Sequence, residues 1–267
     1  MARSSLPELF RTDQLQATYA TVLGFGAAGT GKTYSIRTCP KPIILATEIG
    51  ETKGFLSLQD LRIPFVKIDS HDDLVAVVAE LTSNPAVGAC AYAGETFDTV
   101  VLDSITQLGE MYLESFVKMK GWTDLHGMDA RGKDPRQAYG YLSEKGRQAY
   151  KLLFSIPAHI YIIAREGLLQ VGDGREATYF PIPELPGQRL PRELPGWPDA
   201  SVRLSRKAGK HVLLTTGEEG APCRVRSPAD APKLPARCTP NMGALMRYMC
   251  GDYDAITQLD PKRAKAA

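Results

Sequence analysis

The chain has 267 residues, of which 32 are Lys or Arg and 30 are Asp or Glu, so its formal net charge is +2. This balance excludes a histone-like or polybasic protein, and any contact with nucleic acid has to come from local patches of charge. The length suits one large α/β domain, for which we expect a core at residues 20–250, an N-terminal extension at 1–19 and a basic tail at 251–267.

The cysteines and the apolar runs bear on the compartment. The five cysteines are odd in number and never form a Cys-x-x-Cys pair, which indicates neither a disulfide framework nor a zinc site. The N-terminal residues hold no apolar core of signal-peptide length, and no run approaches the roughly 20 apolar residues that span a bilayer. The sequence therefore predicts a cytoplasmic protein without a membrane partner, in the host cytoplasm if a phage encodes it.

An apolar run at residues 21–23 leads into the sequence GAAGTGKT at residues 26–33. This stretch fits the pattern of a phosphate-binding loop, in which glycines let backbone N–H groups surround phosphate oxygens. Lys32 would reach the β- and γ-phosphates, Thr33 would bind Mg²⁺, and a helix starting near Lys32 would direct its positive end at the same anion. An ordinary glycine-rich turn needs neither side chain. The predicted ligands are ATP and Mg²⁺, and the predicted contacts are Gly26, Ala27, Ala28, Gly29, Thr30, Gly31, Lys32, Thr33 and Tyr34.

Strands and helices alternate after this loop, which is typical of a parallel sheet with crossover helices. Residues 43–47 read as a strand that ends before Glu48, and residues 65–68 read as a short strand. Residues 71–81 form an amphipathic pattern opened by the cap-like Ser70, which predicts a helix.

The four residues Thr99–Leu102 carry no charge and read as a fully buried parallel strand that ends at Asp103. Open α/β sheets bind ligands at this end of their strands. A phosphate-binding loop needs a carboxylate there to hold Mg²⁺. Asp103 is therefore the predicted metal-site partner of Thr33, although an apolar run ending in aspartate also occurs as a plain strand followed by a helix cap.

The second half of the predicted core begins with two helices, at residues 105–120 and 137–154, separated by a polar stretch at 121–136. A buried strand follows at 159–164. The next segment, residues 165–199, is rich in Gly and Pro and is predicted to be a long loop.

The last predicted elements are strands. Residues 202–204 and 212–215 are expected to form a hairpin at the edge of the sheet, turning through residues 207–210. Arg224 and Arg226 lie at alternate positions of a late strand and therefore point to the same side.

The order of these parts resembles the RecA-type ATPase core. More narrowly, it is similar to the small phage nucleotide-binding proteins that are single-strand annealing ATPases of phage recombination. The resemblance covers roughly residues 20–250 and depends on GAAGTGKT, on Thr47-Glu48, on VVLDS at residues 100–104 and on the distal Arg-x-Arg. It implies a RecA-like α/β P-loop NTPase core, with a mostly parallel sheet flanked by helices and a C-terminal β-hairpin edge.

The resemblance also implies catalytic roles. Glu48 would orient the water that attacks the γ-phosphate, although Glu51 lies nearby and Glu48 could merely cap a turn. Such cores often carry Gln or His as a γ-phosphate sensor at the end of the fourth strand; this sequence departs from that pattern, and Arg165 is the candidate. Arg224 and Arg226 would reach the γ-phosphate of a neighbouring subunit, or else would be solvated charges on an edge strand.

Two loops line a channel for single-stranded DNA in RecA-like proteins, and their counterparts here are residues 121–136 and 165–180. Basic side chains beside aromatic ones suit single strands, because cations follow the backbone and rings stack on bases. Loop charges that serve solubility alone are the alternative. The predicted DNA contacts are Lys118, Lys120, Trp122, Arg131, Lys133, Arg136, Arg175 and Tyr179.

The leading hypothesis is a DNA-stimulated ATPase that binds and anneals single strands as a homo-oligomeric ring or filament, with a single-strand DNA-binding protein as a candidate partner. A nucleoside or nucleotide kinase is an alternative, although no clear lid with paired arginines is present. A helicase loader that uses ATP as a switch is another. Hydrolysis stimulated by single strands would separate the first hypothesis from the kinase, and strand annealing would separate it from the loader.

Overall fold

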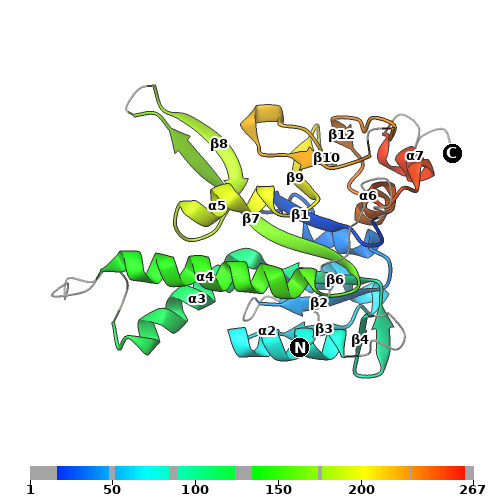
Figure 1. Ribbon diagram of the computed structural model, residues 1–267. Helices are drawn as coiled ribbons and strands as arrows, with labels where there is room; N and C mark the ends of the chain where they lie inside the picture. Colours follow the sequence, from blue (N-terminus) through cyan, green and yellow to red (C-terminus); the bar gives the residue numbers. More distant parts are fainter. Residues whose placement is uncertain are drawn as a thin grey trace, which may run out of the picture.

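The computed structural model describes residues 17–47, 52–83, 90–123, 125, 134–173, 176–228 and 230–261. Across these residues the chain forms a ten-stranded mixed sheet with helices on both faces (Figure 1). A separate two-stranded sheet joins β4 (Cys90–Tyr92) to β5 (Glu95–Phe97). The α/β fold expected from the sequence, with a mostly parallel sheet flanked by helices, is confirmed.

Six neighbouring strands of the large sheet run parallel, in the order β9-β1-β7-β6-β2-β3. The strands β10 and β12 extend the sheet beyond β9 in antiparallel pairing, while β8 and β11 pair with β7 and β9. The bounds are β1 (Thr21–Gly26), β2 (Pro42–Ala46), β3 (Phe65–Lys67), β6 (Thr99–Asp103), β7 (His159–Val171), β8 (Thr178–Pro183), β9 (Ala200–Lys207), β10 (Lys210–Leu214), β11 (Arg224–Val225) and β12 (Arg237–Cys238).

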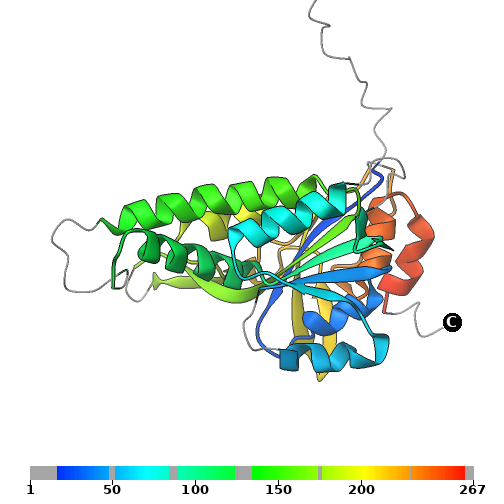
Figure 2. The same cartoon turned by 90° about the horizontal axis from the view of Figure 1, so that it is seen from below.

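The buried apolar side chains form two clusters, one on each face of the sheet, because successive residues of a strand point to opposite sides. One cluster packs beneath α2 (His71–Thr82), α3 (Ile105–Met119) and α4 (Pro135–Phe154), and the other beneath η2 (Thr33–Thr38), η3 (Leu56–Leu61), α6 (Met242–Met249) and α7 (Ile256–Leu259). Figure 2 shows the two helical layers with strands between them. The remaining short helices are α1 (Thr52–Phe55), α5 (Arg189–Glu193), η5 (Leu194–Gly196), η6 (Glu218–Gly220) and η7 (Tyr253–Ala255).

Each of the predicted helices α2, α3 and α4 begins after a residue whose side chain caps its first turn. The Ser70 side chain accepts a hydrogen bond from the Asp73 N–H at the start of α2, and Ser104 accepts one from Gln107 at the start of α3. Asp134 does the same for α4, with Pro135 at its first position. These caps satisfy N–H groups that have no partner within the helix.

The helix expected near Lys32 is a short 3₁₀ element, η2. The Ser35 hydroxyl donates to the Lys32 carbonyl at 2.6 Å, and the Thr38 hydroxyl donates to the Ser35 carbonyl at 2.7 Å. Side-chain bonds of this kind compete with α-helical backbone bonding. Pro40 then disfavours a helical conformation of the residue before it, so the element ends at Thr38.

The prediction of a long loop at residues 165–199 is wrong. β7 continues beyond Ala164 to Val171 and pairs with β8 in an antiparallel ribbon that projects from the body (Figure 1). The prolines Pro181 and Pro183 obscured this strand in the sequence. They are tolerated because β8 pairs on one side only, with β7, so the missing N–H groups are not needed.

The predicted hairpin is present: β9 and β10 pair through a turn at Ala208-Gly209. Its outer strand is covered in turn by the two residues of β12, which the sequence pattern did not indicate. In the parts of the chain that the structure describes, each helix is too short or too polar to cross a bilayer.

Candidate nucleotide-binding site

The phosphate-binding loop, residues 26–33, follows β1 at the carboxyl end of the parallel strands. Gly29 and Gly31 adopt φ of +73° and +88°, a conformation that L side chains rarely take. A Cβ on Gly26 would lie 2.3 Å from the Leu204 carbonyl oxygen and 2.7 Å from the Thr30 hydroxyl. Gly29 and Gly31 therefore need glycine for their backbone conformation, whereas Gly26 needs it because the loop packs tightly against β9.

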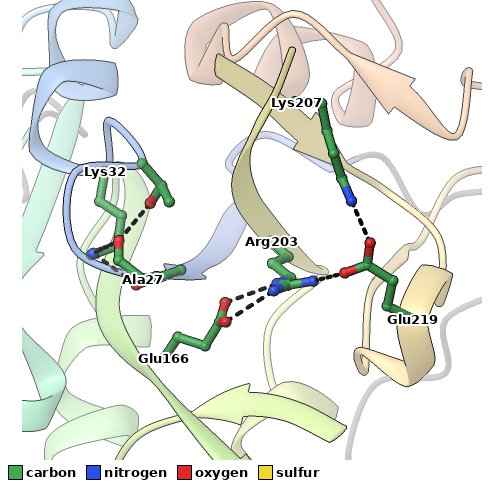
Figure 3. A network of polar contacts seen from close by, with 8 residues as sticks. Ala27, Lys32, Glu166, Arg203, Lys207 and Glu219 are labelled. Atoms are coloured by element: carbon green, nitrogen blue, oxygen red, sulfur yellow. Dashed lines mark hydrogen bonds and ion pairs between the residues drawn. The ribbon is translucent and has the colours of Figure 1, made fainter. Parts of the chain in front are cut away.

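The Lys32 amine folds back to the start of this loop. It donates to the carbonyl oxygens of Gly26 at 2.8 Å and Ala27 at 2.9 Å (Figure 3). The Thr30 hydroxyl donates to the same Ala27 carbonyl at 2.8 Å. The loop carbonyls thus hold the lysine amine within the same loop whose N–H groups the sequence motif assigns to phosphate binding.

Thr33 and Asp103 meet although they follow different strands. The Thr33 hydroxyl donates to the Asp103 carboxylate at 2.9 Å. β7 lies between β1 and β6, so the contact crosses one intervening strand. A hydroxyl and a carboxylate are oxygen ligands of the kind that Mg²⁺ takes in addition to water and nucleotide phosphates. The two residues fit the metal site predicted for them.

Thr47 joins the ends of β2 and β6 by three hydrogen bonds. Its N–H donates to the Asp103 carbonyl at 3.0 Å, its hydroxyl donates to the Ser104 carbonyl at 2.8 Å, and it accepts from the Ser104 N–H at 2.8 Å. The side chain is fully buried. Glu48 and Glu51 lie outside the described residues, so the catalytic role of Glu48 stays a prediction.

Tyr161 contacts the two elements that flank the loop, β1 and η2, and was missed in the sequence. Its hydroxyl lies 2.9 Å from the Ser35 hydroxyl, and burial raises the pKa of Tyr161. A Cβ on Gly24 would lie 2.7 Å from the Tyr161 ring, so the glycine makes room for it. The one signal was a phenol in the otherwise apolar run at residues 160–164.

Arg165, the predicted sensor, is held by acidic side chains. It forms an ion pair with Glu110 of α3, and its Nε lies 3.2 Å from the Glu184 carboxylate. These contacts hold the guanidinium on the side of the sheet that α3 covers. The sensor role of Arg165 stays a prediction, and the contacts do not join it to Lys32 or Asp103.

The next residue, Glu166, belongs to a charged network beside the loop (Figure 3). Its carboxylate accepts two hydrogen bonds from Arg203 of β9, at 2.8 and 2.9 Å, and the side chains are only 11% and 13% exposed. Arg203 also pairs with Glu219, which in turn pairs with Lys207. Arg203 is in register with Phe25, the residue before the loop. The pair therefore bridges β7 and β9 across the strand that carries the phosphate-binding loop.

The two late arginines lie at the opposite end of the sheet. β11 pairs with the first residues of β9, where Asp199 also accepts from the Thr21 N–H at the start of β1. Arg224 donates to the carbonyls of Pro195 and Pro198, each at 3.1 Å, and to that of Gly196. Arg226 donates to the same Gly196 carbonyl at 3.4 Å. Both side chains thus point to one side, away from the phosphate-binding loop of their own chain.

The predicted DNA contacts that the structure describes lie at the end of α3, at the start of α4 and on β8, and these places are toward the same side of the molecule in both views (Figures 1 and 2). At the end of α3, the Lys120 amine lies 5.6 Å from the centre of the Phe116 ring, and Trp122 packs edge-on against Phe116. Tyr179 is 56% exposed on the ribbon. Lys118 and Arg136 are exposed at the end of α3 and the start of α4, and Arg131, Lys133 and Arg175 lie outside the described residues.

Residues 18–227, most of the chain, match the family model described as an AAA domain. The chain belongs to the AAA domain family. This membership, together with the phosphate-binding loop, Lys32 and Asp103, identifies the domain as a nucleotide-binding P-loop ATPase domain. No curated protein matches the sequence.

Proposed function

We propose that this AAA-domain protein is an ATP-dependent single-stranded DNA-binding and annealing protein of phage-type homologous recombination. It hydrolyses ATP under stimulation by single-stranded DNA and acts as a homo-oligomer, either a ring or a filament. A single-strand DNA-binding protein is a candidate partner.

The observation that supports this function best is the course of β7. The strand lies between β1 and β6, and Arg165 is in register with Gly26, the first residue of the phosphate-binding loop. The same strand continues without interruption into the ribbon that carries Tyr179 on β8. A rearrangement at the phosphate-binding loop would therefore act on one end of a strand whose other end forms the exposed ribbon.

The chain supplies the groups that ATP hydrolysis needs. Lys32 and the loop N–H groups would bind the phosphates, and Thr33 and Asp103, whose side-chain oxygens lie 2.9 Å apart, would hold Mg²⁺. When bound, the metal neutralises charge on the β- and γ-phosphates. Glu48, which follows Thr47, orients the attacking water.

The proposed DNA surface joins the ribbon to the end of α3. Lys118, Lys120 and Arg136 supply positive charge, while Trp122 and Tyr179 supply rings on which bases can stack. A small-molecule kinase has no use for an exposed ribbon that carries Tyr179 at the far end of β7. The ribbon favours a polymeric ligand for this reason.

Binding of a fluorescent oligonucleotide across a range of salt concentrations tests the proposal. The affinity should fall as salt rises, and Lys120→Ala should flatten the slope by about one unit, because each phosphate contact releases about one counterion. Tyr179→Ala should instead cost about 1–3 kcal/mol of binding with little change in slope, because it removes stacking.

Lys67→Ala is the matched control, because Lys67 is an exposed lysine on β3, where it pairs with Asp69 at 2.9 Å. It should leave the affinity and its salt dependence unchanged. Absence of binding to single strands at low salt would defeat the annealing function and favour the kinase.

A further inference from the structure

A histidine from a distant strand touches the phosphate-binding loop. Nδ1 of His211, on β10, lies 2.9 Å from the carbonyl oxygen of Thr30. A Cβ built on Gly31 would lie 3.1 Å from the same nitrogen. Because a carbonyl oxygen can only accept, Nδ1 carries the hydrogen and donates it to the loop.

This contact fixes the orientation of one peptide group. The Thr30 carbonyl and the Gly31 N–H belong to the same planar peptide, which is trans, so they point in opposite directions. With the carbonyl held toward β10, the Gly31 N–H points away from β10. Among the described residues this N–H donates to no protein acceptor. It is a donor of the kind that binds a phosphate oxygen.

The peptide needs such a restraint because of its sequence. Gly31 has φ of +88° and Gly29, two residues earlier, has φ of +73°. Glycine adopts positive and negative φ with nearly equal ease, so a loop with glycine at these positions can rotate its peptide groups at little cost. Rotation of the Thr30–Gly31 peptide would turn the N–H toward β10 and remove it from the ligand.

We propose that His211 is a positioning residue that holds the Thr30–Gly31 peptide in the orientation required for binding a nucleoside triphosphate. His211 acts through the backbone of the loop, so it preorganises one N–H donor and does not take part in the chemical step. The β9–β10 hairpin thereby becomes part of the nucleotide site. The inference rests on nucleotide binding by the loop and is independent of DNA annealing.

Two substitutions separate the hydrogen bond from the bulk of the ring. His211→Asn keeps a donor at about the place of Nδ1, whereas His211→Phe keeps a planar ring and removes the donor. His211→Phe should weaken ATP binding about tenfold, as expected for the loss of roughly 1.4 kcal/mol. His211→Asn should stay within about threefold of the wild type. For both variants kcat at saturating ATP should change by less than about twofold, since the contact serves binding.

Calorimetric titration of each protein with ATP and Mg²⁺ gives the affinity, and steady-state assays give KM and kcat. Lys210→Ala, a change of the exposed neighbour on the same strand, is the control and should bind ATP as the wild type does. Thermal unfolding without nucleotide shows whether the hairpin is intact in each variant.

Weak binding by His211→Phe together with near-normal binding by His211→Asn would support the role of His211. Equal affinity in the wild type and in His211→Phe would overturn it while leaving the nucleotide-binding function intact. Equal loss in both variants would also overturn it, because a donor would then not restore binding. Failure of the wild type to bind ATP would contradict the nucleotide-binding function and, with it, the inference.

Discussion

Lys32 is the side-chain cation of the phosphate-binding loop, and its amine donates to the carbonyls of Gly26 and Ala27. Lys32→Ala should abolish detectable ATP binding, because no other residue between Gly26 and Thr33 carries a positive charge. Folding should be retained, since the amine is not part of either apolar cluster. Titration calorimetry and thermal unfolding measure the two effects. Unchanged ATP affinity would show that this loop does not bind the phosphates.

The site residues differ in how far they could be predicted from the sequence. Gly26, Lys32, Thr33 and Asp103 lie in two local patterns, and the structure brings Thr33 and Asp103 within 2.9 Å. His211 and its contact with the loop could not be predicted in this way, because it depends on the register of β10 against β9 and of β9 against β1. Tyr161 and Arg203 are further examples: a single polar residue in a strand gives no signal of the partner it will meet.

At the scale of elements, the Glu166–Arg203 pair joins β7 to β9 across β1 with both side chains nearly buried. Glu166→Ala or Arg203→Ala should each lower the free energy of unfolding by about 3 kcal/mol, because either change leaves a charge in a poorly solvated place. The double variant should cost clearly less than the sum of the two single changes.

Urea unfolding of the wild type, the two single variants and the double variant gives the four free energies of a double-mutant cycle. Arg189→Ala is the control, because its ion pair with Glu193 is more exposed, with the Arg189 side chain 69% accessible. It should change the free energy by less than about 1 kcal/mol. Additive losses in the Glu166 and Arg203 variants would mean that the two side chains do not act as a pair.

His159 connects the beginnings of two central strands and makes the fold sensitive to acid. Its Nδ1 accepts from the Ala20 N–H at 3.0 Å, just before β1. Burial lowers the pKa of His159 below its ordinary value of 6.5, against an opposing effect of Asp98. The unfolded chain therefore binds this proton more readily than the folded one. Stability contributed by the neutral ring is present above pH 6.5 and decreases as the pH falls below it.

Unfolding in urea at about pH 7.5 and pH 5.5 tests this sensitivity. His159→Asn keeps an acceptor near the position of Nδ1 but does not titrate, so its stability should fall less between the two pH values. Part of the dependence should remain, because burial also lowers the pKa of His71. An identical pH dependence in the wild type and the variant would exclude His159 as its source.

Element types were predictable where the apolar period was regular, as in α2 and α3, and where an uncharged apolar run marked a buried strand, as in β2 and β6. The ribbon of β7 and β8 was not. Its prolines and glycines have the composition of a loop, and its strand character depends on tertiary pairing that covers only one side of β8. The β12 strand, with two residues, is too short for any periodic pattern.

At the scale of the whole molecule, Arg224 and Arg226 lie at the end of the sheet opposite to the loop. A role at the γ-phosphate therefore requires this end of one subunit to face the loop of its neighbour. Mixed assemblies test the arrangement. Lys32→Ala subunits should partly restore hydrolysis to subunits carrying Arg224→Ala and Arg226→Ala, because a cation supplied in trans can raise the rate ~10³-fold or more.

In the mixing experiment, subunits carrying Arg192→Ala in place of the two arginine changes are the control and should hydrolyse ATP without help. Arg224 also binds three backbone carbonyls around η5, so thermal unfolding of its variant separates a loss of structure from a loss of catalysis. Normal hydrolysis by both arginine variants, or a monomeric protein in the presence of nucleotide and DNA, would rule out a contribution in trans.

The central claim is that the γ-phosphate site and the ribbon belong to one DNA-dependent ATPase. The measurement that tests it most directly is ATP hydrolysis with and without single-stranded DNA, for the wild type and for Glu48→Gln. We expect single strands, and not duplex of the same length, to stimulate the wild type, and we expect Glu48→Gln to bind ATP without hydrolysing it. Hydrolysis that is indifferent to single-stranded DNA while the protein binds ATP normally would contradict the claim.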